Sequence, residues 1–341
     1  MKILIIGLGS VGQRHLQNLR SIYKKKINIE ILRQRGFDKV IREKKILKNK
    51  IIRKYYNLKE NLSFFEATKK KPDLVIISNP SSMHEKFIMM SLKKKLNFFV
   101  EKPALTSAKK IKPIVKMINK HNVISMVGFQ SRFNPLLIKV KKIIEGKSLG
   151  KIINADFKWH TFLPDFHRYE NYKKSYAARK KLGGGVVFSL IHEIDVIQWF
   201  FGMPKTTYAI KNFHKKINIE SEENVHCLMK FKNKNNYFDI FLNLSFTEKK
   251  NIRKFKIIFE HGTLYCNLEK NFFEIYKLNK LVKKIKIKIK RNDLFKNEIK
   301  HLIKAIKRNV KTEISFEEGA KSVVIAEKII DSFNKSKELN I

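Results

Sequence analysis

The chain has 341 residues, of which 43% are hydrophobic and 11% aromatic. This length favours about two domains, and so much apolar surface excludes both a disordered chain and a small disulfide-stapled one. Lysine and arginine number 74 and aspartate and glutamate 30, and the resulting net charge of +44 suggests nucleic acid or an anionic membrane as a partner.

The positive charge is spread along the whole chain and is not confined to one segment. It accompanies abundant Asn, Ile and Phe, which share A/T-rich codons with lysine, so genome composition explains the charge better than a selected polyanion site does. We therefore predict no specific nucleic-acid partner. The charge should still speed encounters with phosphorylated or nucleotide-bearing ligands.

Three further features bear on partners and location. The two cysteines, Cys227 and Cys266, have the spacing of neither a disulfide framework nor a metal site. No stretch approaches the ~18 uninterrupted apolar residues of a membrane span. The opening MKILIIG continues into a glycine turn and not into a signal-cleavage site. We therefore predict a cytoplasmic protein with no metal and no membrane partner.

The first part of the chain alternates short apolar runs with helical patterns. Residues 2–6 form a β-branched run, which is followed by a glycine turn and a helix from about residue 10. The same reasoning predicts strands at 27–32, 73–78, 97–100 and 123–129, and helices at 84–95 and 107–119. Such alternation predicts an α/β doubly wound parallel sheet of the Rossmann class, assigned to a domain of residues 1–122.

From residue 151 the pattern changes to alternating or aromatic-rich segments separated by turn signals, which predict an antiparallel sheet. One helix is predicted near 182–201, and two more near 293–307 and 316–333. We therefore expect residues 123–341 to form a substrate-binding α+β domain with one large, open, mostly antiparallel sheet, whose last helix packs back on the first domain. The open sheet would expose a large apolar face, which predicts a homodimer or homotetramer.

The segment KKIKIKIK at 283–290 alternates isoleucine with lysine. One interpretation is a strand that grips phosphates. The other, which we favour, is an edge strand whose lysines prevent pairing with other sheets.

A glycine pattern, GLGSVG, lies between the first strand and the first helix, and this context indicates dinucleotide binding rather than an ordinary turn. Gly7 permits the tight turn, Gly9 lets a pyrophosphate approach the backbone, and Gly12 allows close helix–strand packing. Ser10 and Val11 begin the helix, whose N-terminus attracts phosphate.

The end of the second strand bears on the choice of dinucleotide. An acidic residue there would accept the ribose 2′-hydroxyl of NAD, but this chain offers Arg33 and Arg35. A guanidinium at this position favours a 2′-phosphate, so the sequence predicts NADP in preference to NAD.

Polar residues follow two other predicted strands of the parallel sheet. Because the carboxyl ends of parallel strands bind ligands, both segments are candidates for the cofactor site. A lysine in such a crevice can donate to a substrate hydroxyl or a cofactor amide. The candidates are Asn79, Pro80, His84, Glu101, Lys102 and Pro103.

Several motifs occur in an order and spacing that resemble the Gfo/Idh/MocA oxidoreductase family: GLGSVGQRH, NPSSMH, EKPALTS, GFQSRFNP and GGGVVFSLIHEIDVIQWFFG. The resemblance extends to ISFEEGAKSVVIAEKIIDSF and so covers nearly the whole chain. The segment LPDFHRYENYKKSYAARKKLGGG is similar to members encoded with genes for surface-polysaccharide and nonulosonic-acid sugar biosynthesis.

The resemblance implies catalytic roles for two residues. Lys102 of EKP corresponds to the active-site lysine, which in the family usually lies beside a cis-proline, here Pro103. His192 corresponds to the catalytic histidine. Many members have a carboxylate one helical turn before that histidine, whereas this chain has Ser189. Asp195, three residues after His192, is a candidate to replace it.

Two further segments, the loop-like stretch before the glycine triplet and the residues after the strand at 123–129, provide candidates around the substrate and the cofactor. The candidates for substrate recognition, besides Lys102 and His192, are Arg132, Asp165, His167 and Arg179. Gln130 is a further candidate for cofactor binding. An ordinary structural role is an alternative for each of them, since loops are polar for many reasons.

Taken together, these features predict an NAD(P)-dependent oxidoreductase that transfers a hydride between nicotinamide and a hydroxyl or keto carbon of a sugar, sugar nucleotide or cyclic polyol. One alternative is a redox-neutral glycosidase or epimerase of the same family, with tightly held NAD. A second is a cofactor-sensing or nucleic-acid-binding protein that uses the positive charge.

Overall fold

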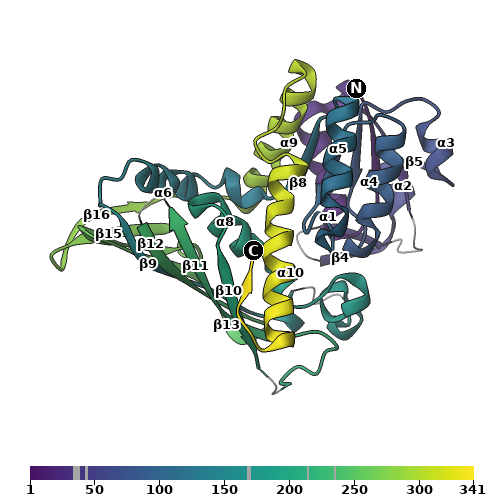
Figure 1. Cartoon of the computed structure of the whole chain (residues 1–341). Helices are drawn as coiled ribbons and strands as arrows, with labels where there is room; N and C mark the ends of the chain where they lie inside the picture. Colours follow the sequence, from purple (N-terminus) through teal and green to yellow (C-terminus); the bar gives the residue numbers. More distant parts are fainter. Residues whose placement is uncertain (34–38, 43–44, 167–169, 213–214, 234–235) are drawn as a thin grey trace. The chain divides into compact units, whose positions relative to one another are not determined.

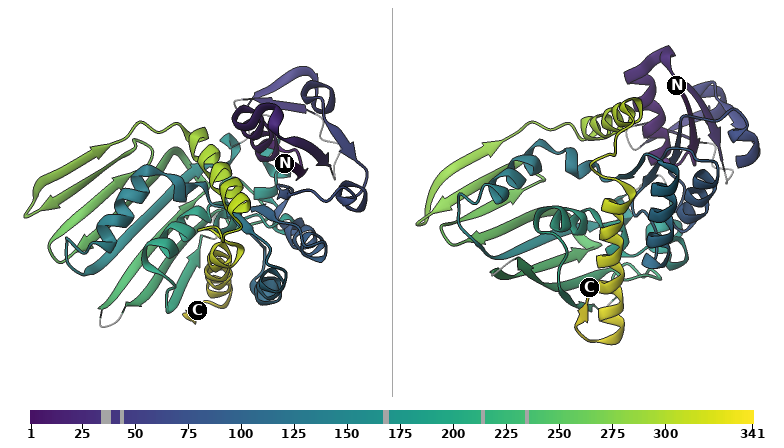
Figure 2. Two further views of the ribbon diagram at one scale, coloured as in Figure 1. Left: turned by 90° about the horizontal axis from the view of Figure 1, so that it is seen from above. Right: turned by 45° about the horizontal axis from the view of Figure 1, so that its top comes forward.

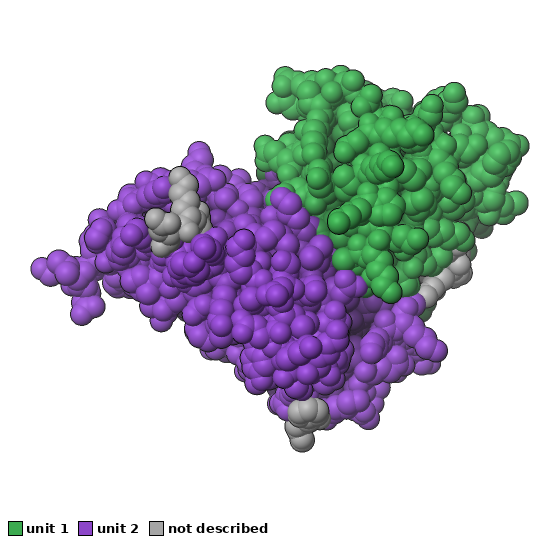
Figure 3. All heavy atoms as spheres, in the orientation of Figure 1, with its two compact units in different colours: residues 1–130, 167–170, 292–320 green, residues 131–166, 171–291, 321–341 purple. Residues whose placement is uncertain are grey.

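The structure is a computed structural model that describes residues 1–33, 39–42, 45–166, 170–212, 215–233 and 236–341 (Figure 1). Residues 1–130, 167–170 and 292–320 form one compact unit, and residues 131–166, 171–291 and 321–341 form a second (Figure 3). Each unit has its own sheet and its own core.

The first unit contains a six-stranded sheet in the order β5-β2-β1-β6-β7-β8, and every neighbouring pair is parallel. This confirms the predicted Rossmann class. Its strands are β1 (Lys2–Ile6), β2 (Asn28–Leu32), β5 (Lys59–Asn61), β6 (Leu74–Ile77), β7 (Phe98–Glu101) and β8 (Ser125–Gly128). Its helices are α1 (Ser10–Tyr23), α2 (Ile52–Tyr56), α3 (Phe64–Thr68), α4 (His84–Lys93), α5 (Ile111–His121) and α9 (Arg291–Arg308).

The central strands are buried because helices lie near both of their faces, as a doubly wound sheet requires. All four residues of β6 are fully buried, and so are Ile5 and Ile6 of β1. Helix α4 contacts α5, whereas α1 is tied to α9 by two hydrogen bonds between the side-chain amides of Asn18 and Asn292.

An antiparallel hairpin that the sequence pattern did not predict follows β2. It comprises β3 (Lys39–Arg42) and β4 (Lys45–Ile51). The Gln13 amide of α1 holds it, because the Gln13 nitrogen donates to the carbonyls of Leu8 and Lys39, and its oxygen accepts from the Ile41 N–H. The glycine turn and the hairpin are therefore connected through one side chain.

The boundary of the first unit differs from the predicted 122/123. Strand β8 pairs with β7, so the chain leaves this sheet only after Gly128. The Val127 N–H donates to the Ile314 carbonyl, and the Phe316 ring packs edge-on against Phe98 at 6.1 Å. Residues 292–320 thus complete the first unit, including the start of helix α10 (Phe316–Lys335).

The second unit contains a nine-stranded sheet in the order β16-β15-β14-β13-β9-β12-β11-β10-β17. Only the β12/β9 pair is parallel within the described residues, so the predicted mostly antiparallel sheet is confirmed. The strands are β9 (Ile152–Phe162), β10 (Thr206–Lys211), β11 (Asn224–Asn233), β12 (Asn236–Ser245), β13 (Thr247–Phe259), β14 (Gly262–Asn267), β15 (Phe272–Lys277), β16 (Lys280–Lys286) and β17 (Leu339–Asn340).

Helices α6 (Pro135–Glu145) and α8 (His192–Phe201) lie on the same face of this sheet in the views of Figures 1 and 2. Aromatic side chains fill the space between α8 and the strands. Phe157 of β9 stacks on Phe255 of β13 at 4.7 Å, and Phe201 of α8 meets Phe157 edge-on at 6.1 Å. The alternation of the strands places these rings on one face.

Tyr208, Ile210, Tyr237 and Phe241, on β10 and β12, are 42 to 68% exposed. Strand β16 is an edge strand, pairs only with β15 among the described strands, and carries mostly exposed lysines. The edge strand predicted at 283–290 is therefore confirmed over 283–286, whereas residues 287–290 lie beyond the end of β16.

The predicted helix at 182–201 is divided in two. Helix α7 (Val186–Ser189) ends before α8 begins at His192, because Leu190, with φ −97 and ψ 21, leaves the regular helical backbone. In the part of the chain that the structure describes, no single helix is long and apolar enough to cross a membrane. One bent pair, 180–189 with 192–201, passes that test by length and composition, and its break is 52°.

Candidate active site

The glycine turn joins β1 to α1 in a conformation that depends on its glycines. Gly7 has φ +85, and a Cβ placed there would lie 2.8 Å from the backbone nitrogen of Asn79. A Cβ on Gly12 would lie 2.1 Å from the Gly7 carbonyl oxygen, whereas a Cβ on Gly9 would meet nothing within 4 Å. Gly7 and Gly12 therefore allow close backbone approach, and Gly9 leaves open space for a ligand.

Helix α1 begins at this turn and is 14 residues long. Its first intrahelical hydrogen bond runs from the Gln13 N–H to the Gly9 carbonyl, so the N–H groups of Ser10 and Val11 have no acceptor within the helix. The first turn contains no acidic residue. These features fit the pyrophosphate of a dinucleotide, which helix N-termini attract.

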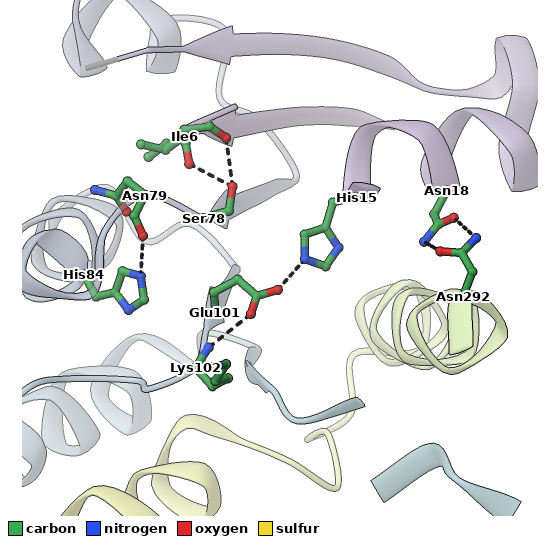
Figure 4. Close-up of polar contacts among 10 residues, drawn as sticks. Ile6, His15, Asn18, Ser78, Asn79, His84, Glu101, Lys102 and Asn292 are labelled. Atoms are coloured by element: carbon green, nitrogen blue, oxygen red, sulfur yellow. Dashed lines mark hydrogen bonds and ion pairs between the residues drawn. The ribbon is translucent and has the colours of Figure 1, made fainter. Parts of the chain in front are cut away.

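The loop that follows β6 lies against the turn. The Ser78 hydroxyl contacts the carbonyl oxygens of Ile6 and Gly7 at 3.0 and 2.9 Å (Figure 4). Asn79 is only 8% exposed, and its side-chain nitrogen and oxygen have no hydrogen-bond partner among the described residues. A buried amide without partners is costly. Asn79 is therefore suited to bind a polar ligand group beside the turn.

His84, the first residue of α4, connects the loops after β6 and β7. Its Nδ1 lies 2.8 Å from the Pro103 carbonyl oxygen, and its Nε2 lies 3.0 Å from the Asn79 carbonyl oxygen. Burial lowers the pKa of His84 against the opposing effect of these contacts. This residue, predicted to bind the cofactor, therefore orients the two loops that carry Asn79 and Lys102.

Lys102 follows β7 directly, and the Lys102–Pro103 peptide bond is cis. The Lys102 N–H donates to the carboxylate of Glu101 at 3.3 Å, and His15 Nε2 lies 2.6 Å from the other oxygen of that carboxylate (Figure 4). His15 is fully buried, with its ring 5.0 Å from Phe99. The backbone that carries Lys102 is thus fixed through a buried His15–Glu101 pair.

A second buried carboxyl, which no sequence motif marks, lies near this pair. Glu298 of α9 is fully buried, and neither carboxyl oxygen has a hydrogen-bond partner among the described residues. Burial, and then the negative charge of Glu101, raise the pKa of Glu298 well above its usual value. Both effects disfavour the charged form of the Glu298 carboxyl.

Arg33 lies immediately after β2, as predicted, but its guanidinium is already paired. Its Nε and Nη2 donate to the two carboxylate oxygens of Glu60, on β5, at 2.6 and 2.7 Å. Glu60 was not among the predicted site residues, because two residues 27 positions apart in the sequence give no local signal. Arg35, the other predicted phosphate ligand, lies outside the described residues.

His192 belongs to the second unit, where it is the first residue of α8 and is 4% exposed. The Trp159 ring of β9 lies 6.2 Å from the His192 ring. The Arg253 guanidinium stacks over Trp159 at 4.2 Å and forms a bidentate pair with Glu193, with contacts of 2.8 and 2.7 Å. His192 therefore lies beside an aromatic ring that an ion pair holds in place.

The sequence predicted that Ser189 lies one turn before His192 on a continuous helix. In the structure Ser189 belongs to α7, and His192 begins the separate helix α8. Asp195 does share α8 with His192. Its carboxylate accepts two hydrogen bonds from Arg132, at 3.0 and 2.7 Å, and Arg132 also donates to the Gln198 side chain at 2.8 Å. Arg132 and Asp195, both buried, thus form a bidentate ion pair at the base of α8.

Two of the remaining predicted substrate residues, Asp165 and Arg179, also lie in the second unit. Asp165 ends a short 3-10 helix (Leu163–Asp165), Arg179 precedes the glycine triplet, and both are exposed. His167 lies outside the described residues. Gln130 begins a 3-10 helix (Gln130–Phe133) directly after the first unit's sheet.

The glycine triplet before α7 is packed closely. Gly185 has φ +104, and a Cβ there would lie 2.1 Å from a carboxylate oxygen of Glu222, which also accepts the Val187 N–H at 3.1 Å. Burial raises the pKa of Glu222 to about 7. The triplet therefore lets the chain turn against a carboxyl group just before His192. No group of three or more His, Cys, Asp or Glu side chains among the described residues can hold a metal ion.

A parallel doubly wound sheet defines a dinucleotide-binding protein when a glycine turn leaves space for the pyrophosphate and the following helix begins at that turn. Residues 1–129 match the model of an oxidoreductase family with an NAD-binding Rossmann fold, and residues 137–265 match the GFO/IDH/MocA C-terminal domain. The chain belongs to the Gfo/Idh/MocA oxidoreductase family.

Curated relatives are similar over part of their lengths. "Uncharacterized oxidoreductase YrbE" of Bacillus subtilis is 28% identical over 214 residues, which cover 61% of this chain and 55% of that protein. "scyllo-inositol 2-dehydrogenase (NAD(+))" of the same organism is 27% identical over 142 residues, covering 40% and 37%. The chain therefore aligns with about half or less of the length of these relatives.

The fold agrees with solved structures over its full length. Levoglucosan dehydrogenase in complex with NADH and levoglucosan has a TM-score of 0.82 and covers 100% of this chain and 99% of that one, at 15% sequence identity. At this identity the likeness establishes the fold alone.

Proposed function

We propose that this chain is an oxidoreductase that transfers a hydride between a nicotinamide and a hydroxyl or keto carbon of a sugar, sugar nucleotide or cyclic polyol. The supporting observation is the arrangement at the carboxyl edge of the parallel sheet, where the glycine turn, the unpartnered Asn79 amide and the loop carrying Lys102 follow neighbouring strands. The names of the inositol and levoglucosan dehydrogenases support the substrate class.

In the proposed reaction, His192 removes a proton from a substrate hydroxyl, and Lys102 stabilises the developing alkoxide. When bound, the nicotinamide supplies the hydride chemistry. Trp159 orients the His192 ring, and the His15–Glu101 pair positions the Lys102 backbone. Asp165, His167 and Arg179 recognise the substrate's polar groups, and Arg132 keeps α8 in place through Asp195.

The residues of the glycine turn, together with Asn79, Pro80, Glu101, Pro103 and Gln130, hold the dinucleotide in this proposal. Arg33 and Arg35 favour NADP over NAD through their positive charge. The cellular role we propose is the biosynthesis of surface-polysaccharide sugars, in the cytoplasm, where the buried Cys227 and Cys266 thiols would remain reduced.

We further propose that two or four copies associate through the open face of the nine-stranded sheet. The exposed Tyr208, Ile210, Tyr237 and Phe241 support this, because apolar side chains gathered on one sheet face favour association. Light scattering of the purified chain tests it, and a monomer at micromolar concentration would contradict it.

Two substitutions test the reaction. Lys102→Met and His192→Ala should each lower turnover by ~10²–10⁴, the usual effect of removing a proton-transfer or charge-stabilising group. Dinucleotide affinity should stay within a few-fold, because the glycine turn is intact. Lys286→Ala, on the exposed edge strand, is the matched control and should be silent.

Turnover is followed by NAD(P)H absorbance at 340 nm with a panel of sugars and cyclic polyols. Near-native turnover of His192→Ala would contradict its role as the base and would direct attention to His167 or Asp165. Substrate conversion without any net absorbance change would instead support the redox-neutral alternative.

A further inference from the structure

The ion pair between Arg33 and Glu60 lies at the end of the second strand of the sheet. The guanidinium and the carboxylate are joined by two short contacts, Nε to Oε1 at 2.6 Å and Nη2 to Oε2 at 2.7 Å. The two side chains are 16% and 21% exposed. This bidentate geometry uses two of the N–H groups with which an arginine binds a phosphate.

The sheet register explains why the two residues meet. Strands β2 and β5 are parallel neighbours, with Leu32 opposite Asn61, so Arg33 and Glu60 lie at the same edge of the sheet. The Gly7 N–H donates to the Leu32 carbonyl at 2.9 Å, which connects this strand end to the glycine turn. In doubly wound folds the corresponding strand end determines how the adenosine ribose is recognised.

We propose that Glu60 sets the balance between NADP and NAD by competing with the 2′-phosphate for the Arg33 guanidinium. The acidic group that is missing at the end of β2, where Leu32 is followed by Arg33, is thus supplied by Glu60 of the neighbouring strand β5. With Glu60 ionised, a 2′-phosphate must displace a carboxylate and also approach its negative charge, whereas a 2′-hydroxyl need not. This inference rests on the dinucleotide-binding function proposed above.

A second carboxylate on the same two strands provides a matched control. Glu30 of β2 accepts hydrogen bonds from the side chains of Asn61, at 2.9 Å, and Lys59, at 3.3 Å. Its side chain is 17% exposed, close to the value for Glu60. Glu30→Gln therefore removes the same charge from a similar environment and leaves the Arg33–Glu60 pair intact.

The experiment measures the dissociation constants of NADPH and NADH by the fluorescence of the bound nicotinamide. Glu60→Gln should shift the ratio of the two constants about tenfold towards NADPH, the effect expected of one released charge-assisted hydrogen-bond pair. Glu30→Gln should shift it less than about threefold, since surface charge effects of this kind are small.

A double-mutant cycle tests whether Arg33 mediates the effect. Arg33→Gln alone should shift the ratio about tenfold towards NADH. In the Arg33→Gln background, Glu60→Gln should change the ratio less than about threefold, because the group for which Glu60 competes is gone. Arg33→Gln also keeps the proposal testable if Glu60→Gln does not fold.

The inference would be overturned if Glu60→Gln left the ratio of the NADPH and NADH dissociation constants unchanged. It would also be overturned if Glu60→Gln shifted this ratio equally in the presence of Arg33 and in the Arg33→Gln background. If the wild type bound neither dinucleotide, the proposed function itself would fail, and this inference with it. If the wild type bound both dinucleotides and Glu60→Gln left the ratio of their dissociation constants unchanged, only this inference would fail.

Discussion

Gly9→Ala and Gly12→Ala place the same methyl group three residues apart, yet the structure predicts different consequences. At Gly12 the new Cβ would lie 2.1 Å from the Gly7 carbonyl oxygen and 2.8 Å from the Ser78 hydroxyl. Since both are far inside van der Waals contact, α1 has to move away from the turn. At Gly9 the Cβ would meet no atom within 4 Å.

The magnitudes follow from these contacts. Overpacking of this kind costs ~1–3 kcal/mol, which lowers the Tm by roughly 2–12 °C for a unit of ~150–250 residues. Gly9 has φ −69 and ψ −170, which alanine adopts freely, so the unfolded-state gain of ~0.4–1 kcal/mol applies. Alanine is a poorer N-cap than glycine by a similar amount. The two effects nearly cancel, and Gly9→Ala should change the Tm by less than ~2 °C.

Affinity should behave differently from stability. The Gly9 methyl would project into the space that we assign to the pyrophosphate, so NADH affinity should fall at least ~10-fold while the fold is intact. Thermal unfolding with and without NADH measures both quantities, because a ligand at ~100 Kd adds ~2.7 kcal/mol. Wild-type NADH binding by Gly9→Ala, or equal destabilisation by both variants, would refute the reasoning.

Three further predictions concern buried groups and surface charge. Because the pKa of Glu298 is raised in the folded state, its contribution to stability is full below the ordinary carboxyl pKa and is lost as pH rises through the raised value. The urea midpoint of Glu298→Gln should therefore rise relative to that of the wild type as pH increases. A difference between the two midpoints that does not change with pH would contradict this. Asp195→Ala should lower the free energy of unfolding by ~3–5 kcal/mol, because it leaves the Arg132 guanidinium buried without its carboxylate. A loss below ~1 kcal/mol in urea unfolding would show that the pair is dispensable. Duplex DNA should bind with a Kd no tighter than ~10⁻⁶ M at ~150 mM salt by fluorescence anisotropy, and nanomolar binding would disprove the composition argument.

Local patterns sufficed to predict most of the first sheet and the glycine turn. The run at 73–78 is apolar throughout because β6 is buried on both faces, and the turn glycines lie at a strand–helix junction that the sequence displays directly. The edge strand was recognisable only in part, because the alternation of lysine with isoleucine extends over 284–290, whereas β16 ends at Lys286.

Long-range pairing and local backbone breaks could not be predicted in this way. Glu60 and Glu298 look like ordinary surface carboxylates in the sequence. Only in the folded chain does Glu60 meet Arg33, and only there does Glu298 lie near Glu101. The apolar run around Leu190 continues without a proline or glycine, so nothing marked the end of α7 before His192. The pairing of Asp195 with Arg132 likewise depends on residues 63 positions apart.

The unusual order in which the first unit is assembled affects its synthesis. Strand β8 is the last strand of its sheet, and residues 312–316 cover its free side: Thr312 donates to the Ser125 carbonyl, and Val127 donates to the Ile314 carbonyl. A ribosome makes these residues only after strands β9 to β16 of the second sheet, which leaves β17 alone to follow. The nascent chain therefore carries an open β8 edge, able to pair with other chains, for more than half of its translation. Chaperones that bind extended segments would have their longest opportunity at this strand.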